Sequence, residues 1–332
     1  MNSDDKLSKL KENWTAMEIE NYSSSLKKKG VPVIFDVEHF RRLLGLRSED
    51  FYSILFKLEY HYHKLEIPKK IVGTYRQLLL PSIKLKYIQR WILDNILYTQ
   101  SCITEVTGFI PGKSIVNNAR PHLKQKYILK LDIEDFFPSI DEKRVFNLFK
   151  NFGYTNRLAR TLSRFCSYEN ELPQGAPSSP YIANLICRKL DARLTALCAK
   201  YALNYTRYAD DITISGGRMV FKLKKHIINI ISDENFSINK SKIKLLTAGD
   251  RKKITGIIVN EKLSVPKKVV RELRQEIYYI KKFNLESHMK KTGNVSKSNY
   301  KGHLFGIAKY IFMIDKDLGT YYLDKLNGID WE

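Results

Sequence analysis

The sequence has little that would place it in a membrane or in an oxidising compartment. No apolar run approaches the roughly 18 residues that a spanning helix needs, and the N-terminal stretch MNSDDKLSKLKENW lacks the apolar core of a signal peptide. The four cysteines, Cys102, Cys166, Cys187 and Cys198, show no paired ligand spacing. We therefore expect a cytoplasmic protein with reduced, mostly buried cysteines, no zinc site and no membrane partner.

Acidic residues are scarce relative to basic ones. The 332 residues contain 57 Lys and Arg against 35 Asp and Glu, which gives a formal net charge of +22. Such an excess suits a polyanionic partner, because each phosphate that a basic side chain neutralises releases counterions and drives binding. With 43% hydrophobic and 12% aromatic residues, the chain has the composition of a folded globular protein. Nucleic acid is therefore the first partner to consider.

Strand-like and helix-like patterns alternate in the middle of the chain. Residues 1–30 are polar and charged, and helical patterns follow from Asp36, which can cap a helix. The stretch YHYHKLEIPKKIVGTYRQLLLPS reads as short strands broken by proline and glycine. Between about residues 125 and 260, strands alternate with helices, which favours an α/β or α+β sheet domain. From Ser264 a new amphipathic helix begins.

Two adjacent aspartates, Asp210 and Asp211, stand in the stretch TRYADDITISGG between an aromatic residue and a strand-like run. Carboxylates beside a buried strand are costly unless a cation neutralises them, which favours a metal site. Asp is also a common turn residue, so a plain hairpin turn explains the pair equally well. A metal site needs a third ligand from elsewhere in the chain.

Asp132, in LKLDIEDFFPS, is the candidate for that third ligand. It ends an apolar strand, where its carboxylate would project beside the aspartate pair if the two strands were neighbours. Two divalent ions about 3.5 to 4 Å apart can activate an attacking hydroxyl and stabilise a leaving pyrophosphate. Mg²⁺ fits such oxygen ligands, with Mn²⁺ as an alternative. Taken by itself, Asp132 can also be a strand-end residue that caps a turn.

Four motifs occur in a specific order along the chain: DIEDFFPS, LPQGAPSSP, RYADD and SINKSKIKLL. This series resembles the reverse transcriptases, whose palm carries an Asp-x-x-x-x-aromatic strand, a Pro-Gln-Gly loop, a Tyr-x-Asp-Asp hairpin and a downstream lysine. The resemblance covers roughly residues 35–330. It implies an α+β right-hand polymerase, with a palm formed by an antiparallel sheet backed by helices and a mainly helical thumb.

Two further stretches resemble the retron reverse transcriptases, which make a branched RNA–DNA hybrid called msDNA from their own noncoding RNA. NARPH, residues 118–122, matches their Asn-Ala-x-x-His element, and ITGIIVN, residues 254–260, is similar to their Val-Thr-Gly element with Ile254 in place of Val. The implied segments are an N-terminal extension (1–30), fingers with the Asn-Ala-x-x-His region (31–125), a palm with the catalytic carboxylates (126–263) and an RNA-binding thumb (264–332).

The resemblance also implies roles for individual residues. Asp132, Asp210 and Asp211 would hold two Mg²⁺ ions, with the backbone carbonyl of Ile133 as a further ligand. Lys242 would protonate the pyrophosphate, and Lys240 is an alternative for this task. The residues implied to bind the incoming nucleotide are Lys69, Arg76, Phe137 and Gln174. The residues implied to bind RNA are Asn118, His122, Thr255, Gly256, Lys267, Arg271, Arg274 and Lys281.

The implied function is an RNA-directed DNA polymerase that copies part of its cognate noncoding RNA into msDNA from dNTPs. The resemblance further implies an antiphage defence system in which a separate effector protein is the partner. Two alternatives stay open. One is another bacterial reverse transcriptase, similar to those of group II introns, and the other is an msDNA-binding scaffold that restrains an effector.

Overall fold

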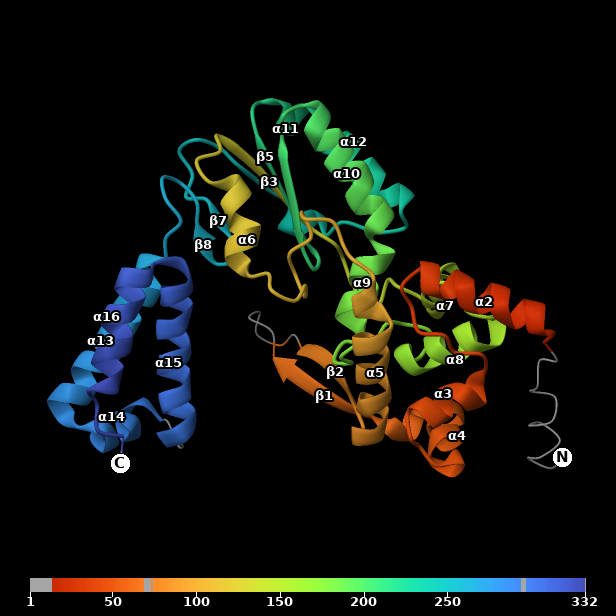
Figure 1. Ribbon diagram of the computed structural model, residues 1–332. Helices are drawn as coiled ribbons and strands as arrows, with labels where there is room; N and C mark the ends of the chain where they lie inside the picture. The colour runs from red at the N-terminus through yellow and green to blue at the C-terminus, as the bar shows by residue number, and fades with distance from the viewer. Residues whose placement is uncertain (1–13, 69–72, 74, 294–296, 332) are drawn as a thin grey trace. The chain divides into compact units, whose positions relative to one another are not determined.

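The computed structural model (Figure 1) describes residues 14–68, 73, 75–293 and 297–331. These residues form two compact units. Unit 1 contains the chain up to Thr104, Ile133–Arg193 and Ile230–Ile238. Unit 2 contains Glu105–Asp132, Leu194–Asn229 and the chain from Asn239 onward. The chain passes between the units several times, so each unit combines segments that are distant in the sequence.

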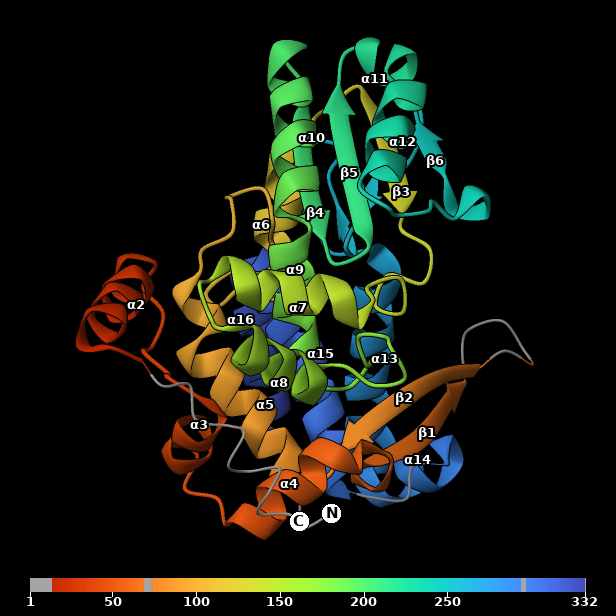
Figure 2. The ribbon, with the colours of Figure 1, turned by 90° about the vertical axis from the view of Figure 1, so that its right-hand side faces the viewer.

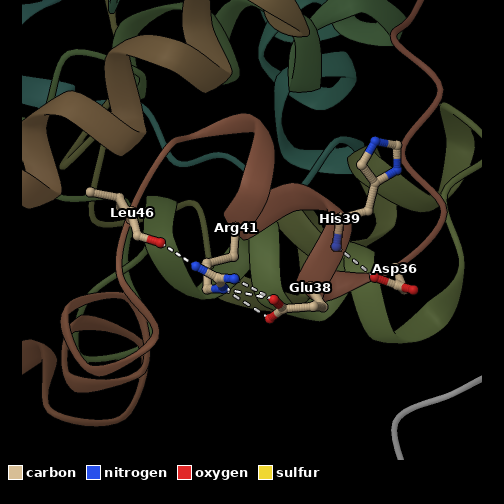
Figure 3. A network of polar contacts seen from close by, with 5 residues as sticks. All are labelled: Asp36, Glu38, His39, Arg41 and Leu46. Atoms are coloured by element: carbon tan, nitrogen blue, oxygen red, sulfur yellow. Dashed lines mark hydrogen bonds and ion pairs between the residues drawn. The ribbon is translucent and has the colours of Figure 1, made fainter.

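The first helices that the structure describes in unit 1 are α2 (Ala16–Lys28), α3 (Val37–Leu43) and α4 (Ser48–Phe56). Asp36 caps α3 as predicted, since its Oδ1 accepts a hydrogen bond from the backbone N–H of His39 at 2.7 Å. Figure 3 shows this cap beside the side chain of Arg41, which donates to Glu38 and to the Leu46 carbonyl oxygen. These contacts hold the connection between α3 and α4.

A β-hairpin and a long helix follow in unit 1. Strands β1 (Tyr62–Pro68) and β2 (Tyr75–Pro81) pair antiparallel, with Tyr62 opposite Pro81. The short strands predicted from the proline and glycine positions are thus confirmed. Helix α5 (Ile83–Asn95) is capped by Ser82, and its apolar side chains at three- and four-residue spacing are buried.

Further helices of unit 1 follow along the chain. They are α7 (Glu142–Asn151), α8 (Asn156–Cys166) and α9 (Ser179–Ile186), and α10 (Arg188–Lys200) continues into unit 2. Phe51 packs edge-on against Phe165, with ring centroids 5.1 Å apart. Such aromatic contacts tie α8 to the N-terminal helices of the unit.

The centre of unit 2 is a four-stranded antiparallel sheet in the order β4 (Asn204–Tyr208), β5 (Asp211–Gly216), β3 (Tyr127–Asp132), β6 (Lys244–Leu246). α11 (Met219–Lys222) and α12 (Lys224–Asp233) follow β5. Figures 1 and 2 together show α10 and α12 over one face of the sheet and α6 (Ile115–Ala119) on the other. A small hairpin of β7 (Lys253–Ile254) and β8 (Ile257–Ile258) shares a buried apolar cluster with β3 and α6. This is the antiparallel sheet backed by helices that the resemblance implied.

The last helices of the described chain are α13 (Lys267–Phe283), α14 (Leu285–Thr292), α15 (Lys297–Ile314) and α16 (Lys316–Asn327). The predicted amphipathic face of α13 is buried in their core through Leu273, Ile277 and Ile280. Helices α15 and α16 approach closely at Gly319, where an added Cβ would lie 2.1 Å from the Cα of Phe312. In the part of the chain that the structure describes, no helix is both long and apolar enough to cross a membrane.

Candidate active site

The aspartate pair lies in a tight hairpin turn. Strand β4 ends at Tyr208 and β5 begins at Asp211, which are paired, so Ala209 and Asp210 form a two-residue turn. Ala209 adopts a left-handed backbone conformation with φ of 56°, as turns of this length require. The hairpin turn suggested by the sequence is therefore confirmed, and it presents both carboxylates at one end of the sheet.

The third aspartate lies at the same end of the sheet. Asp132, the last residue of β3, is directly opposite Asp211 in the antiparallel register of β3 and β5. Lys242 Nζ donates to Asp132 Oδ1 at 2.7 Å, and Lys130 Nζ lies 3.6 Å from Asp211 Oδ1. The predicted neighbourhood of the two strands is confirmed, and it brings Asp132, Asp210, Asp211 and Lys242 together in unit 2.

The charges of this cluster are unbalanced. Burial and the nearby carboxylates of Asp132 and Asp211 raise the pKa of Asp210, because each disfavours its ionised form. The hydrogen bond to Asp132 raises the pKa of Lys242, which keeps its ammonium protonated. Three carboxylates share this end of the sheet, and an added cation would favour their ionised forms.

The residues fit a divalent metal ion that is completed by substrate. Among the described residues, no group of three or more His, Cys, Asp and Glu side chains is arranged so that it could hold a metal ion by itself. Mg²⁺ does not need such a group, since it takes one or two carboxylates and fills its remaining positions with water and substrate phosphates. Asp132, Asp210 and Asp211 would hold it, and the Lys242 ammonium donates a hydrogen bond to the first of these carboxylates.

A segment that sequence reasoning missed supports the hairpin turn. The backbone N–H of Thr107 donates to the Arg207 carbonyl at 2.9 Å, and an added Cβ on Gly108 would lie 2.7 Å from the Ala209 nitrogen. Arg207 is fully buried, and its guanidinium donates to the Ala209 carbonyl at 3.1 Å. The sequence contains one signal for this support: Arg207 stands within an apolar strand pattern, and a buried arginine needs polar partners.

Asn118 and His122 lie in the interior of unit 2, with exposed fractions of 1% and 0%. His122 Nδ1 is 2.6 Å from Ser215 Oγ on β5, and its Nε2 is 2.8 Å from Thr206 Oγ1 on β4. Burial lowers the pKa of His122 to about 3, so the ring is neutral. A neutral ring can donate to one hydroxyl and accept from the other. His122 therefore links both strands of the hairpin, and its RNA-binding role stays a prediction without a direct contact surface.

Asn118 connects the hairpin support to the Ile-Thr-Gly element. Thr107 Oγ1 donates to Asn118 Oδ1 at 2.9 Å, and Asn118 Nδ2 donates to Thr255 Oγ1 at 3.3 Å. The next residue, Gly256, accepts a hydrogen bond at its carbonyl from Tyr310 Oη of α15 at 3.1 Å. The two sequence elements that resemble retron enzymes thus form one continuous polar network in unit 2.

The predicted nucleotide-binding residues belong to unit 1. The Leu79 N–H of β2 donates to the Gln174 carbonyl at 2.8 Å, and only glycine fits at 175, where a Cβ would lie 2.5 Å from the Leu79 oxygen. The Pro-Gln-Gly loop is thus hydrogen-bonded to β2, the strand that contains Arg76. Phe137 is half-buried beside Phe136, and Lys69 lies outside the described residues. Ile133, which follows Asp132, has a buried side chain.

The predicted RNA-binding cations of the C-terminal region are at the surface. Lys267, Arg271, Arg274 and Lys281 all lie on α13 and are exposed. The exposed Tyr278 and Tyr279 lie on the same helix. This helix therefore presents basic and aromatic side chains to solvent, which leaves their binding role a prediction.

Comparison with known proteins places these features in a family. Residues 67–296, more than half of the chain, match the reverse transcriptase (RNA-dependent DNA polymerase) family. The fold and the site therefore define an RNA-directed DNA polymerase with a right-hand fold. Telomerase from Candida albicans, solved in complex with a fragment of telomeric RNA, aligns with a TM-score of 0.45 at 10% identity, over 88% of this chain and 68% of that chain.

Two relatives specify the branch of the family. The chain is 36% identical over 259 residues to the retron Ec86 reverse transcriptase of Escherichia coli, covering 77% of this chain and 81% of the relative. It is 30% identical over 355 residues to the retron Mx162 reverse transcriptase of Myxococcus xanthus, covering 95% of this chain and 71% of the relative. The chain belongs to the retron reverse transcriptases.

Proposed function

We propose that this enzyme copies part of a cognate noncoding RNA into a short DNA that remains branched to the RNA, using dNTPs and two divalent metal ions. The observation that carries the proposal is the register that sets Asp132 opposite Asp211 beside the Asp210 turn. Carboxylates from two adjacent strands then converge on one point, as two-metal nucleotidyl transfer requires.

Each polar group of the site has a proposed role. Asp132, Asp210 and Asp211 hold the metal ions, with the Ile133 carbonyl as a further oxygen ligand. When bound, two Mg²⁺ ions supply activation of the primer hydroxyl and stabilisation of the leaving pyrophosphate. Lys242 leaves Asp132 and donates a proton to that pyrophosphate. The Lys242 ammonium, which contacts Asp132 in the structure, carries the proton that this step needs.

The incoming nucleotide is recognised by residues of unit 1. The Phe137 ring lies under the sugar and excludes a ribose 2′-hydroxyl, which selects deoxynucleotides. Gln174 contacts the nucleotide from a loop that is fixed to β2. Arg76 and Lys69 bind the triphosphate, a task suited to charge-assisted hydrogen bonds. The exposed cations of α13 bind the folded RNA through its phosphates.

In the wider setting, we propose that the enzyme works in the cytoplasm within an antiphage defence system. Its msDNA and RNA then act together with a separate effector protein. The fingers, palm and thumb correspond to residues 31–125, 126–263 and 264–332, after an N-terminal extension of 1–30. Membership of the retron reverse transcriptases supports this setting. Purification from native cells tests it, since an effector should copurify with the protein and its nucleic acid.

The test of the enzymatic proposal uses the purified protein and its noncoding RNA. The bound nucleic acid is treated with RNase, DNase and a debranching enzyme before it is sized on a gel. We expect a short DNA joined to RNA through a 2′,5′ linkage that the debranching enzyme cleaves. Synthesis should require dNTPs and Mg²⁺ and should be absent in Asp210→Asn. Linear RNA alone, without a discrete DNA, would overturn the proposal.

A further inference from the structure

A cavity in unit 1 lies among helices that the proposed reaction does not use. Its volume is about 820 Å³, which is within the range of small-ligand sites. Most of its lining residues come from α4, α7 and α8, which belong to the same unit. None of the residues assigned to metal, nucleotide or RNA binding in the previous subsection lines it.

The wall of this cavity is strongly basic. Its cations are Lys143 on α7 and Arg157, Arg160 and Arg164 on α8, against one carboxylate, Glu142. The three arginines recur at three- and four-residue steps, which places them on one face of the helix. Within the described chain, neither Lys143 nor Arg160 forms an ion pair. The cavity therefore carries a net positive charge that its own residues leave unbalanced.

Aromatic rings lie beside these cations. Tyr52 and Phe56, four residues apart on α4, stack with ring centroids 6.0 Å apart and 13° between their planes. Phe56 is 63% exposed, and the Arg160 guanidinium lies over the Phe146 ring at 5.7 Å from its centroid. A large exposed ring next to unbalanced cations suits a ligand with flat apolar faces and a negatively charged backbone.

We propose that this cavity binds an unpaired segment of single-stranded nucleic acid, with bases on Phe56 and Tyr52 and phosphates on Arg160 and Lys143. Aromatic stacking platforms inside a positively charged groove are the general means of holding single strands without sequence preference. The cations lie on two helices, so they suit a run of phosphates better than a single one. The inference rests on the proposed function in one respect, namely that the enzyme binds nucleic acid.

The experiment measures binding of a fluorescein-labelled oligothymidylate of about eight nucleotides to the purified full-length protein by fluorescence anisotropy. A chain-terminated primer–template duplex in excess keeps the catalytic site occupied. A bromodeoxyuridine version of the same oligonucleotide is crosslinked by ultraviolet light, and the attached peptides are identified by mass spectrometry. We expect crosslinks at Tyr52, Phe56 or Phe146.

Two variants and two matched controls make the test specific. We expect Phe56→Ala and Arg160→Glu each to weaken oligonucleotide binding by roughly fivefold or more, since stacking and phosphate contacts are lost. Tyr60→Ala removes a ring that is 74% exposed outside the cavity, and Lys86→Glu makes the same type of charge change on α5. Both controls should bind within about twofold of the parent. Equal circular dichroism melting temperatures confirm that all four fold.

Primer extension on the same preparations separates this inference from the proposed function. Phe56→Ala and Arg160→Glu should extend a primer normally, whereas Asp211→Asn should lose extension and keep oligonucleotide binding. Unchanged affinity in both cavity variants, or crosslinks only outside the cavity, would overturn the inference. Displacement by free dTTP at equal nucleotide concentration would assign the cavity to a mononucleotide instead. Stronger competition by an acidic glutamate–tyrosine copolymer would assign it to a protein partner.

Discussion

The polar network below the β4–β5 hairpin and the basic surface of α13 make an instructive comparison. The sequence assigns RNA binding to both, yet Asn118 and His122 are buried with protein partners at 2.6 to 3.3 Å, whereas Lys267 and Arg271 are exposed. Buried polar groups need fixed partners, but exposed charges exchange water for a ligand at little cost. The buried network therefore holds the β4–β5 hairpin in place, and the exposed cations of α13 are accessible to a ligand.

The largest effect should come from the carboxylates that the hairpin presents. Asp211→Asn keeps the shape of the side chain but removes its charge, so we expect DNA synthesis to fall by about a hundredfold or more. Steady-state primer extension measures this loss. Asp317→Asn makes the same change at an exposed position on α16 and should leave synthesis unchanged. Comparable activity in both variants would show that the Asp211 carboxylate is not needed for DNA synthesis.

His122→Leu tests whether the network below the hairpin is structural. The substitution leaves the hydroxyls of Thr206 and Ser215 without their ring partners, so the free energy of unfolding should fall by about 1–3 kcal/mol. Urea denaturation measures the loss, and DNA synthesis should fall with it because both hairpin strands lose an anchor.

Gln89→Leu is the matched control, since Gln89 is a fully buried amide of unit 1 that donates to Tyr62 and to the Phe165 carbonyl. It should lose comparable stability with a smaller effect on kcat. A His122→Leu protein with parental stability and weakened RNA binding would instead support the RNA-contact prediction.

The pH dependence of stability offers a second way to examine His122. Its pKa falls from 6.5 to about 3 on folding, so the unfolded chain binds one more proton between these values. The contribution of the neutral His122 ring to the free energy of unfolding is therefore fully present above about pH 6.5. It decreases as the pH falls below this value, by up to about 1.4 kcal/mol per pH unit. The stability gap between the parent and His122→Leu should narrow between pH 7 and pH 5. A constant gap would show that His122 does not titrate as a buried neutral ring.

The smallest effects are expected on α13. Lys267→Ala and Arg271→Ala should leave the free energy of unfolding within about 0.5 kcal/mol, because both side chains are exposed. Each should weaken RNA binding and reduce the salt dependence of log K by about 0.7 to 0.9. Filter binding at several salt concentrations measures this slope. Lys309→Ala on α15 serves as the exposed control. An equal effect of this variant would mean that RNA binding depends on the net charge of the protein and not on the cations of α13.

The sequence predicts the features that depend on near neighbours. The Asp36 cap, the β1–β2 strands, the buried face of α13 and the hairpin around Asp210 all follow from short patterns. The order of the four motifs that resemble reverse transcriptases also predicts that Asp132 lies near Asp211, because the family resemblance adds long-range information that periodicity lacks.

What the sequence could not predict depends on partners far along the chain. His122 and Ser215 are 93 residues apart, and nothing near either residue indicates the other. The supporting role of Arg207 and the basic cavity of α7 and α8 likewise emerge only when helices and strands pack together. The break at Cys187, between the end of α9 and the start of α10, is likewise not signalled by the residues around it.

The close approach of Gly108 to the Ala209 turn has a practical consequence for protein engineering. Any side chain at 108 would displace the backbone beside Asp210 and Asp211, so this position is closed to labels and to saturation mutagenesis. Gly217 and Gly249 have no neighbouring atom within 4 Å of an added Cβ. Both glycines belong to the same unit as Gly108 and are therefore suitable entry points for a fluorophore or a tag that should leave the polymerase working.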